Sequence, residues 1–244
     1  MNRRDVWMDI LPSFERVELG LNLALLSDRF DVLVDAHFDG KTTELTLWRT
    51  IEIRRDSEMP KLFVEGKSEG FPMPDRPLPN KIRFKHLWIK YIDHSVIEFL
   101  RSNQQIWDRS GTKLEMPCVG KQTEDDQTLC DAFAHEIWPI FATNIRYLSF
   151  ANADQLDILR RRTSPTILTD LKHLNAIDSG RLCPDVLLAD DFDGPNATAG
   201  QALAKWLHTP TKDGHQKRLS CFEKEYPQTL NGSTISRRSC HTFS

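Results

Sequence analysis

Few residues in this 244-residue chain have the types and spacing that catalysis or metal binding requires. His135-Glu136 begins like the HExxH helix of zinc proteases, but Pro139 stands where the second histidine is needed. The acidic run from Asp190 to Asp193 lacks the glycine and distal glutamate of a calcium loop, and a solvated loop explains it better. The sequence therefore predicts no metal site.

The cysteines and histidines do not form a recognisable catalytic group either. The five cysteines are never closer than twelve residues apart, which is typical of a reducing compartment and not of a disulfide framework (Cys118, Cys130, Cys183, Cys221 and Cys240). Cys118 and Cys130 lack CxxC spacing and are predicted to be buried thiols. Phosphate-binding, dinucleotide-binding and serine-hydrolase motifs are absent from the sequence. We expect a protein that is not an enzyme and needs no cofactor.

Composition limits the partners and the compartment. The hydrophobic fraction of 39% and the charged fraction of 27% are ordinary for a globular protein. A net charge of −3 gives no reason to expect nucleic acid as a partner. No run approaches the ~20 apolar residues of a membrane span, and the N-terminus lacks the apolar core of a secretory signal. A cytoplasmic or nuclear protein without a membrane partner is expected.

Residues 6–38 are the most clearly patterned part of the chain. Trp7, Ile10, Leu11 and Phe14 recur at helical spacing, residues 17–26 are apolar on more than one side, and residues 30–38 return to helical spacing. Segments this short are marginal as isolated helices in water. We therefore expect the three helices to pack on one another, with some apolar surface left for a partner.

This stretch resembles an F-box, the three-helix module that docks onto the Skp-type adaptor of a cullin–RING ubiquitin ligase. The matching residues are Ile10-Leu11, Phe14, Val17-Glu18-Leu19, the run 25–30, Leu33-Val34 and Phe38. The Leu-Pro pair that usually opens an F-box is missing ahead of Ile10. The resemblance implies that six residues bind the adaptor: Ile10, Leu11, Phe14, Leu19, Leu26 and Phe30. The alternative is a helical cap whose apolar residues only cover the next domain.

After residue 40 the apolar period changes. Alternating apolar residues predict strands over 44–54 and 62–64. Four prolines within residues 71–79 exclude a helix interior or a central strand, so an extended surface connector is predicted there.

A weak repeat follows the connector. Residues 84–89, 145–150 and 171–176 share an apolar residue, a base, a ring-bearing residue and a leucine, and residues 113–116 are a fainter copy. Helical patterns lie between or after these copies, over 94–107, 128–143, 154–162 and 196–208. A strand followed by a helix, repeated, predicts a stacked array that resembles an irregular leucine-rich repeat. A compact α/β domain with one mixed sheet fits nearly as well.

The strands of such an array line one face of the domain. Leu87, Leu148 and Leu174 are predicted to be core. The ring-bearing residues His86, Tyr147 and His173 are predicted to form an outward ladder that binds a target peptide. The alternative is that helices also cover that side and bury the rings.

These patterns predict a mixed α and β fold in four parts: an F-box-like helical module (1–40), short strands with a proline-rich connector (41–80), a leucine-rich-repeat-like strand–helix domain (81–210) and a mobile tail (211–244). This layout resembles a substrate-receptor subunit of a Skp–cullin–F-box ubiquitin ligase. Its partners would be the Skp-type adaptor protein and an unknown target protein. The alternative is a stand-alone interaction or scaffold protein.

Overall fold

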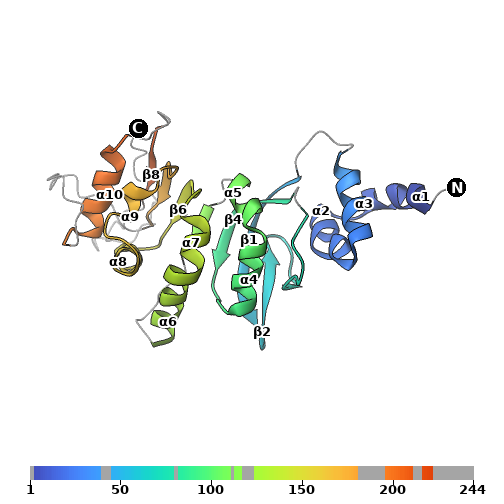
Figure 1. Cartoon of the computed structure of the whole chain (residues 1–244), viewed down its shortest axis with the longest axis horizontal. Coiled ribbons are helices and arrows are strands. Elements are labelled where there is room, and N and C mark those ends of the chain that lie inside the picture. The colour runs from blue at the N-terminus through green and yellow to red at the C-terminus, as the bar shows by residue number, and fades with distance from the viewer. Residues whose placement is uncertain are drawn as a thin grey trace, which may run out of the picture. The chain divides into compact units, whose positions relative to one another are not determined.

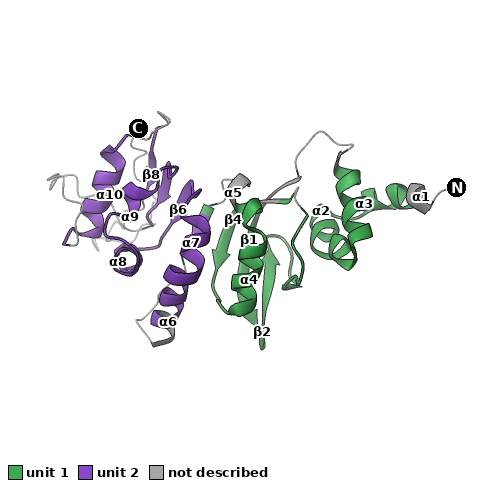
Figure 2. Ribbon diagram, in the orientation of Figure 1, with its two compact units in different colours: residues 1–113 green, residues 114–244 purple. Residues whose placement is uncertain are grey.

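The computed structural model describes residues 3–39, 45–79, 82–110, 113–116, 124–180, 196–210 and 216–221. These residues form both helices and strands, so the fold is mixed α/β (Figure 1). The chain divides into two compact units, residues 1–113 and 114–244 (Figure 2). This division differs from the boundaries at 40 and 80 expected from the sequence, because the N-terminal helices and the first strands belong to one unit.

Unit 1 begins with the three helical segments that the spacing predicts. The first is α1 (Arg3–Ile10) with a 3₁₀ turn (Leu11–Ser13). The second consists of α2 (Arg16–Glu18), a π turn (Leu19–Leu23) and a 3₁₀ turn (Ala24–Leu26). The third is α3 (Asp28–Asp39). They enclose one cluster of buried side chains: Leu11, Leu19, Ala24, Leu33, Val34 and Phe38.

The sheet of unit 1 has the order β3-β2-β1-β4. Strand β1 (Leu45–Asp56) pairs antiparallel with β2 (Met59–Val64) and parallel with β4 (Ile82–Ile89), while β3 (Phe71–Pro72) pairs antiparallel with β2. The predicted strands over 62–64 and 84–89 lie within these strands, and β1 contains residues 45–54 of the strand predicted over 44–54. Six aliphatic side chains in register form the buried face of the sheet: Ile51, Ile53, Leu62, Val64, Leu87 and Ile89.

Two helices, α4 (His94–Ser102) and α5 (Gln104–Ser110), replace the single helix predicted over 94–107. They lie on the buried face, where Trp107 stacks on Phe84 of β4 with 5.7 Å between ring centroids. The break is at Asn103, whose buried amide donates to the Phe99 carbonyl at 2.8 Å and accepts from the Leu78 N–H at 2.7 Å. Asn103 thus fixes the proline-rich connector to the helices.

In unit 2, parallel strands are connected by helices. Strands β6 (Tyr147–Ser149), β7 (Ala176–Asp178) and β8 (Arg218–Ser220) are parallel neighbours in chain order. Helices α8 (Ala153–Arg162) and α9 (Ile167–Asp170) connect β6 to β7, and α10 (Ala199–His208) lies between β7 and β8. Leu148, Ile177 and Leu219 stand side by side in the three strands and are buried.

The start of unit 2 carries the remaining elements. Strand β5 (Lys113–Glu115) lies at the boundary between the units, within the predicted faint copy. The helix predicted over 128–143 is α6 (Glu124–Ala132), a π turn (Phe133–Ile137) and α7 (Trp138–Phe141). The π turn ends at Ile137, two residues before Pro139, which has no N–H to continue an α-helical ladder.

Two predictions for unit 2 are wrong in part. The third copy of the repeat is not a strand over 171–176, because residues 171–175 form a turn and β7 begins at Ala176. The tail is not wholly mobile, because β8 pairs with β7 inside the predicted tail. The remainder of residues 211–244, outside 216–221, lies outside the described residues. None of the helices described is long and apolar enough to cross a membrane.

Candidate functional site

The six residues predicted to bind an adaptor fall into two groups. Leu11 and Leu19 are 0% and 1% exposed in the N-terminal cluster, so the prediction that they offer surface to a partner is wrong. Phe30 is half-buried and meets Trp7 edge-on at 4.9 Å. The other three side chains are exposed: Ile10 by 40%, Phe14 by 42% and Leu26 by 67%.

Exposed apolar side chains concentrate in the same helices. Six large hydrophobic residues are exposed in the described part of the chain, and five of them lie between residues 6 and 32. We call these five the exposed apolar set: Val6, Ile10, Phe14, Leu26 and Val32. Sequence reasoning missed Val6 and Val32, although Val6 lies one helical turn before Ile10. The sixth residue, Met59, is 68% exposed in β2.

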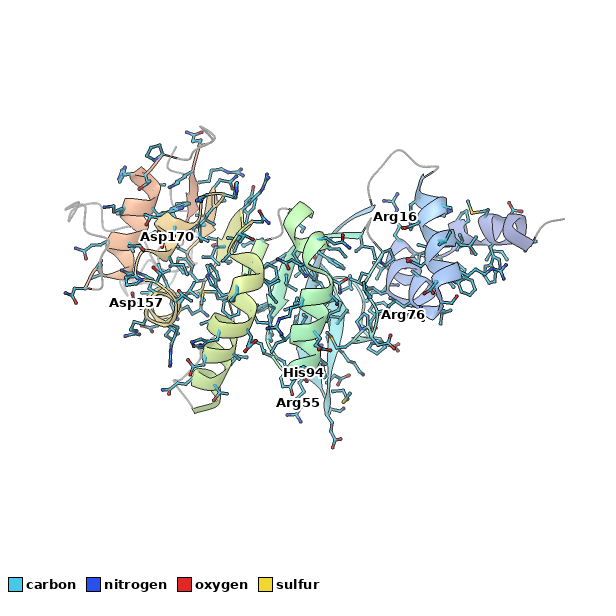
Figure 3. All side chains as sticks on the ribbon, viewed as in Figure 1. Arg16, Arg55, Arg76, His94, Asp157 and Asp170 are labelled. Carbon is cyan, nitrogen blue, oxygen red and sulfur yellow. The ribbon has the colours of Figure 1, made fainter. Side chains whose placement is uncertain are left out.

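The N-terminal helices are also attached to the sheet of unit 1. Lys67 Nζ lies 2.9 Å from Glu15 Oε2 and 3.2 Å from Glu18 Oε1, and these hydrogen bonds raise the pKa of Lys67. Arg76 donates to Asp28 at 2.7 Å beside α3 (Figure 3). Gly20 approaches β4 so closely that a Cβ there would lie 2.4 Å from Ile82 Cδ1. The helices therefore cap one end of the sheet while the exposed apolar set remains open.

The predicted ladder of His86, Tyr147 and His173 does not form. Tyr147 of β6 stands in register with Ala176, whereas His173 is exposed in the turn three residues before β7. His86 belongs to β4 of unit 1, where it is half-buried opposite Thr50. The repeated sequence pattern predicted a strand that includes His173, but β7 begins only at Ala176, so the His173 ring lies outside the strand.

Tyr147 has a different neighbour across the sheet of unit 2. Its row continues through Ala176 to Arg218, and the Arg218 guanidinium donates a hydrogen bond to the Tyr147 hydroxyl. The guanidinium carbon also lies 5.8 Å from the centre of the Tyr147 ring. The small side chain of Ala176 lets these two long side chains meet above the middle strand.

The outward face of unit 1 is organised around Glu52. The register between β1 and β4 shifts between Leu47 and Thr50, and in β4 Phe84 and Leu87 are both buried although they are an odd number of residues apart. Beyond this irregularity Trp88 lies opposite Glu52, and Phe63 lies opposite Glu52 from the other side. The two rings and the carboxylate form a row on the side of the sheet away from α4 and α5, because side chains in register share one face.

A second row carries cations. Arg54 of β1 lies opposite Lys61 of β2, and Lys90 follows the end of β4, where its N–H bonds to the Ile53 carbonyl. The Arg54 guanidinium lies 3.7 Å above the Phe63 ring centre, and Lys90 Nζ lies 3.4 Å above the Trp88 ring. Both cations reach Glu52 Oε1, at 3.6 Å and 3.0 Å. We call these two rows the cation–aromatic face: Glu52, Phe63, Trp88, Arg54, Lys61 and Lys90.

The candidate catalytic and metal-binding residues remain scattered. Cys130 and Cys221 are buried cysteines, while Cys118 and the acidic run at 190–193 lie outside the described residues. The His135 ring is exposed and bonds its own helix at the Asp131 carbonyl. Within the part of the chain that the structure describes, no three His, Cys, Asp or Glu side chains gather as metal ligands do.

Lys217 has an unusual environment beside the end of α10. Its ammonium donates to the Trp206 carbonyl and lies 4.9 Å from the centre of the Trp206 ring. Burial outweighs these contacts and lowers the pKa of Lys217 from 10.5 to about 8. The unfolded chain therefore holds this proton more tightly than the folded chain between these two values.

The free energy of unfolding is therefore expected to rise with pH through the interval from about 8 to 10.5, because the unfolded state binds more protons there. Lys217→Met removes the titrating group and should remove this rise. The measurement is urea unfolding of both proteins across the interval, compared as a difference so that other titrating groups cancel. A constant difference at all pH values contradicts the prediction.

A comparison of the chain with protein families, with curated proteins and with solved structures found no match.

Proposed function

We propose that this chain is a substrate-receptor subunit of a Skp–cullin–F-box ubiquitin ligase, which binds the adaptor through its N-terminal helices and a target through its remaining surface. The observation that carries the proposal is the concentration of the exposed apolar set within the stretch that resembles an F-box. Single exposed hydrophobic residues are common, but a gathering of them in one module is typical of a partner-binding surface.

The two groups of F-box-like residues have separate roles in this proposal. Leu11 and Leu19 hold the helices together from within, while Ile10, Phe14 and Leu26 offer the surface that an adaptor contacts. The Leu-Pro pair that usually opens an F-box is absent, so the exposed apolar set supplies most of the apolar contact.

The role of the chain in this proposal is tethering. A receptor of this kind catalyses nothing itself and raises the effective concentration of a target near the conjugating enzyme. The parallel strands β6, β7 and β8, with helices between them, resemble the leucine-rich-repeat plan. Arrays of that plan offer extended surfaces to protein partners, which supports a target-binding role.

Replacing Phe14 and Leu26 together by alanine tests the proposal. Truncation of a buried interface anchor typically costs about 2 kcal/mol or more, which reduces affinity at least roughly 30-fold. We expect the double variant to lose co-purification with the Skp-type adaptor while its circular dichroism stays that of the wild type. Met59→Ala is the matched control, because Met59 is as exposed as Leu26 but lies outside the helices.

The second candidate is a scaffold or interaction protein whose helices only cap the sheet. The close approach of Gly20 to Ile82 and the ion pairs of Lys67 favour it. A wild-type protein that does not co-purify with the adaptor establishes this candidate and excludes the ligase role.

A further inference from the structure

We propose that the cation–aromatic face of unit 1 binds an acidic, extended segment of a target protein. This inference rests on the proposed function, because it assigns the surface by which the proposed receptor binds its target protein. The binding itself needs no adaptor, so it can be tested separately.

The face is open to a partner. The helices α4 and α5 pack on the opposite side of the sheet, against Phe84 and the aliphatic rows. A groove of about 350 Å³ crosses the face, and Glu52, Arg54, Phe63 and Trp88 are among the residues that line it. The Arg54 side chain is 48% exposed, whereas Glu52 beneath it is 17% exposed.

The charges in the second row are unbalanced. Lys61, Arg54 and Lys90 are three cations, and the described carboxylates that pair with them are two, Asp56 and Glu52. Lys61 holds Asp56 at 2.6 Å, and this hydrogen bond lowers the pKa of Asp56. Arg54 and Lys90 must therefore share Glu52.

Like charges directly opposite each other weaken a sheet. Arg54 and Lys61 nevertheless occupy paired positions. A carboxylate supplied by another protein would give Arg54 or Lys90 a partner of its own and relieve the repulsion. The unbalanced cations thus favour an anionic occupant over a cationic one.

The two aromatic rings restrict the cationic side chains to positions from which they can contact such a ligand. Phe63 and Trp88 hold the ends of Arg54 and Lys90 above their rings, so less side-chain freedom is lost on binding. Arg54 also presents a planar donor fork that matches a carboxylate.

The two ends of the cation–aromatic face differ in charge. At the end away from the cations, Glu65 Oε2 accepts from the Thr50 N–H at 3.2 Å, and Lys67, which also lines the groove there, is already paired with Glu15 and Glu18, so that end is acidic. An acidic stretch is therefore expected to lie over Arg54, Lys61 and Lys90 and not over Thr50. Side chains of the segment that follow the acidic stretch would enter the groove beside Phe63 and Trp88.

The experiment is a selection of random linear peptides, displayed on phage, against the full-length chain. We expect the selected peptides to be enriched in aspartate and glutamate. Fluorescence anisotropy with the most enriched peptide should show binding that weakens as salt is added. Selected peptides without an excess of acidic residues, or with an excess of lysine and arginine, overturn the proposal.

Two variants locate the binding. Arg54→Ala with Lys90→Ala should weaken the peptide at least about tenfold, since it removes the two cations that share Glu52. Arg161→Ala with Lys172→Ala makes the same change of charge at exposed positions of unit 2 and should leave binding unchanged. Equal weakening by both pairs shows a nonspecific charge effect and overturns the proposal.

A third variant separates a binding role from a structural one. Glu52→Gln releases both cations, so it should tighten the acidic peptide. If the face only stabilises the fold and the peptide binds elsewhere, Glu52→Gln would lower stability without tightening the peptide. Adaptor co-purification should be unchanged in every one of these variants, so failure here and failure of the ligase proposal are distinct results.

Discussion

Replacing Leu11 by alanine is expected to open the N-terminal helices, whereas replacing its neighbour Phe14 is not. Leu11 is 0% exposed and belongs to the cluster that joins α3 to the two earlier segments. Leucine-to-alanine changes in a core cost about 3 kcal/mol, since they remove buried surface and leave a cavity. That loss raises the population of the locally opened state roughly 100-fold.

Hydrogen exchange measured by mass spectrometry checks this expectation. Peptides from residues 16–38 should exchange much faster in Leu11→Ala, while those from α8 keep their rates. Phe14→Ala should leave all rates within a few-fold of the wild type and still impair the adaptor. The separation of core and contact residues fails if both variants speed exchange equally, because Phe14 would then also be part of the core.

This pair of residues shows how far sequence spacing can predict a small helical module. The spacing predicted that Leu11 and Phe14 share one helical face and that three helices pack together; the packing is present, but the shared face is not. Which of them faces inward depends on the 3₁₀ turn at Leu11–Ser13, where Pro12 ends the first helix. Beyond that turn the rotation of 3.6 residues per turn no longer applies, so Leu11 turns inward and Phe14 outward.

The alternation of apolar residues located the strands in the sequence, but it did not predict which of their side chains are buried. An alternating pattern in 84–89 predicts that Phe84 and Leu87 point to opposite sides. Both are nevertheless buried, and β1 carries an irregularity in its register with β4 between Leu47 and Thr50, opposite this part of β4. A shift of this kind is set by the partner strand, so it cannot be derived from the sequence of one strand alone.

The repeat was misplaced for a related reason. Leu174 is buried as predicted, yet it lies in the turn before β7 and not in the strand. The pairing of Tyr147 with Ala176 and Arg218 joins residues that are far apart in the chain. The cation–aromatic face was also missed, because its residues come from three strands and share no local motif.

The largest effect expected in unit 2 concerns Arg160. This arginine is only 5% exposed at the end of α8. Its Nε donates to the Pro165 carbonyl at 3.0 Å, and its Nη1 donates to the Ala197 carbonyl at 2.7 Å and to Asp157 at 3.3 Å. One planar side chain thereby ties α8 to the segment before α9 and to the segment before α10.

Arg160→Ala is expected to lower the free energy of unfolding by about 3 kcal/mol, because it leaves buried carbonyls without donors. Arg161→Ala makes the same change one residue along the helix, at an exposed position, and should stay within about 0.5 kcal/mol of the wild type. Urea unfolding of the three proteins measures both values. Arg160→Lys should fall between them, since an ammonium can satisfy one carbonyl but cannot span the positions that the guanidinium fork reaches. If Arg160→Ala and Arg161→Ala are equally stable, water replaces the guanidinium, and the contact between α8 and α10 depends on apolar packing alone.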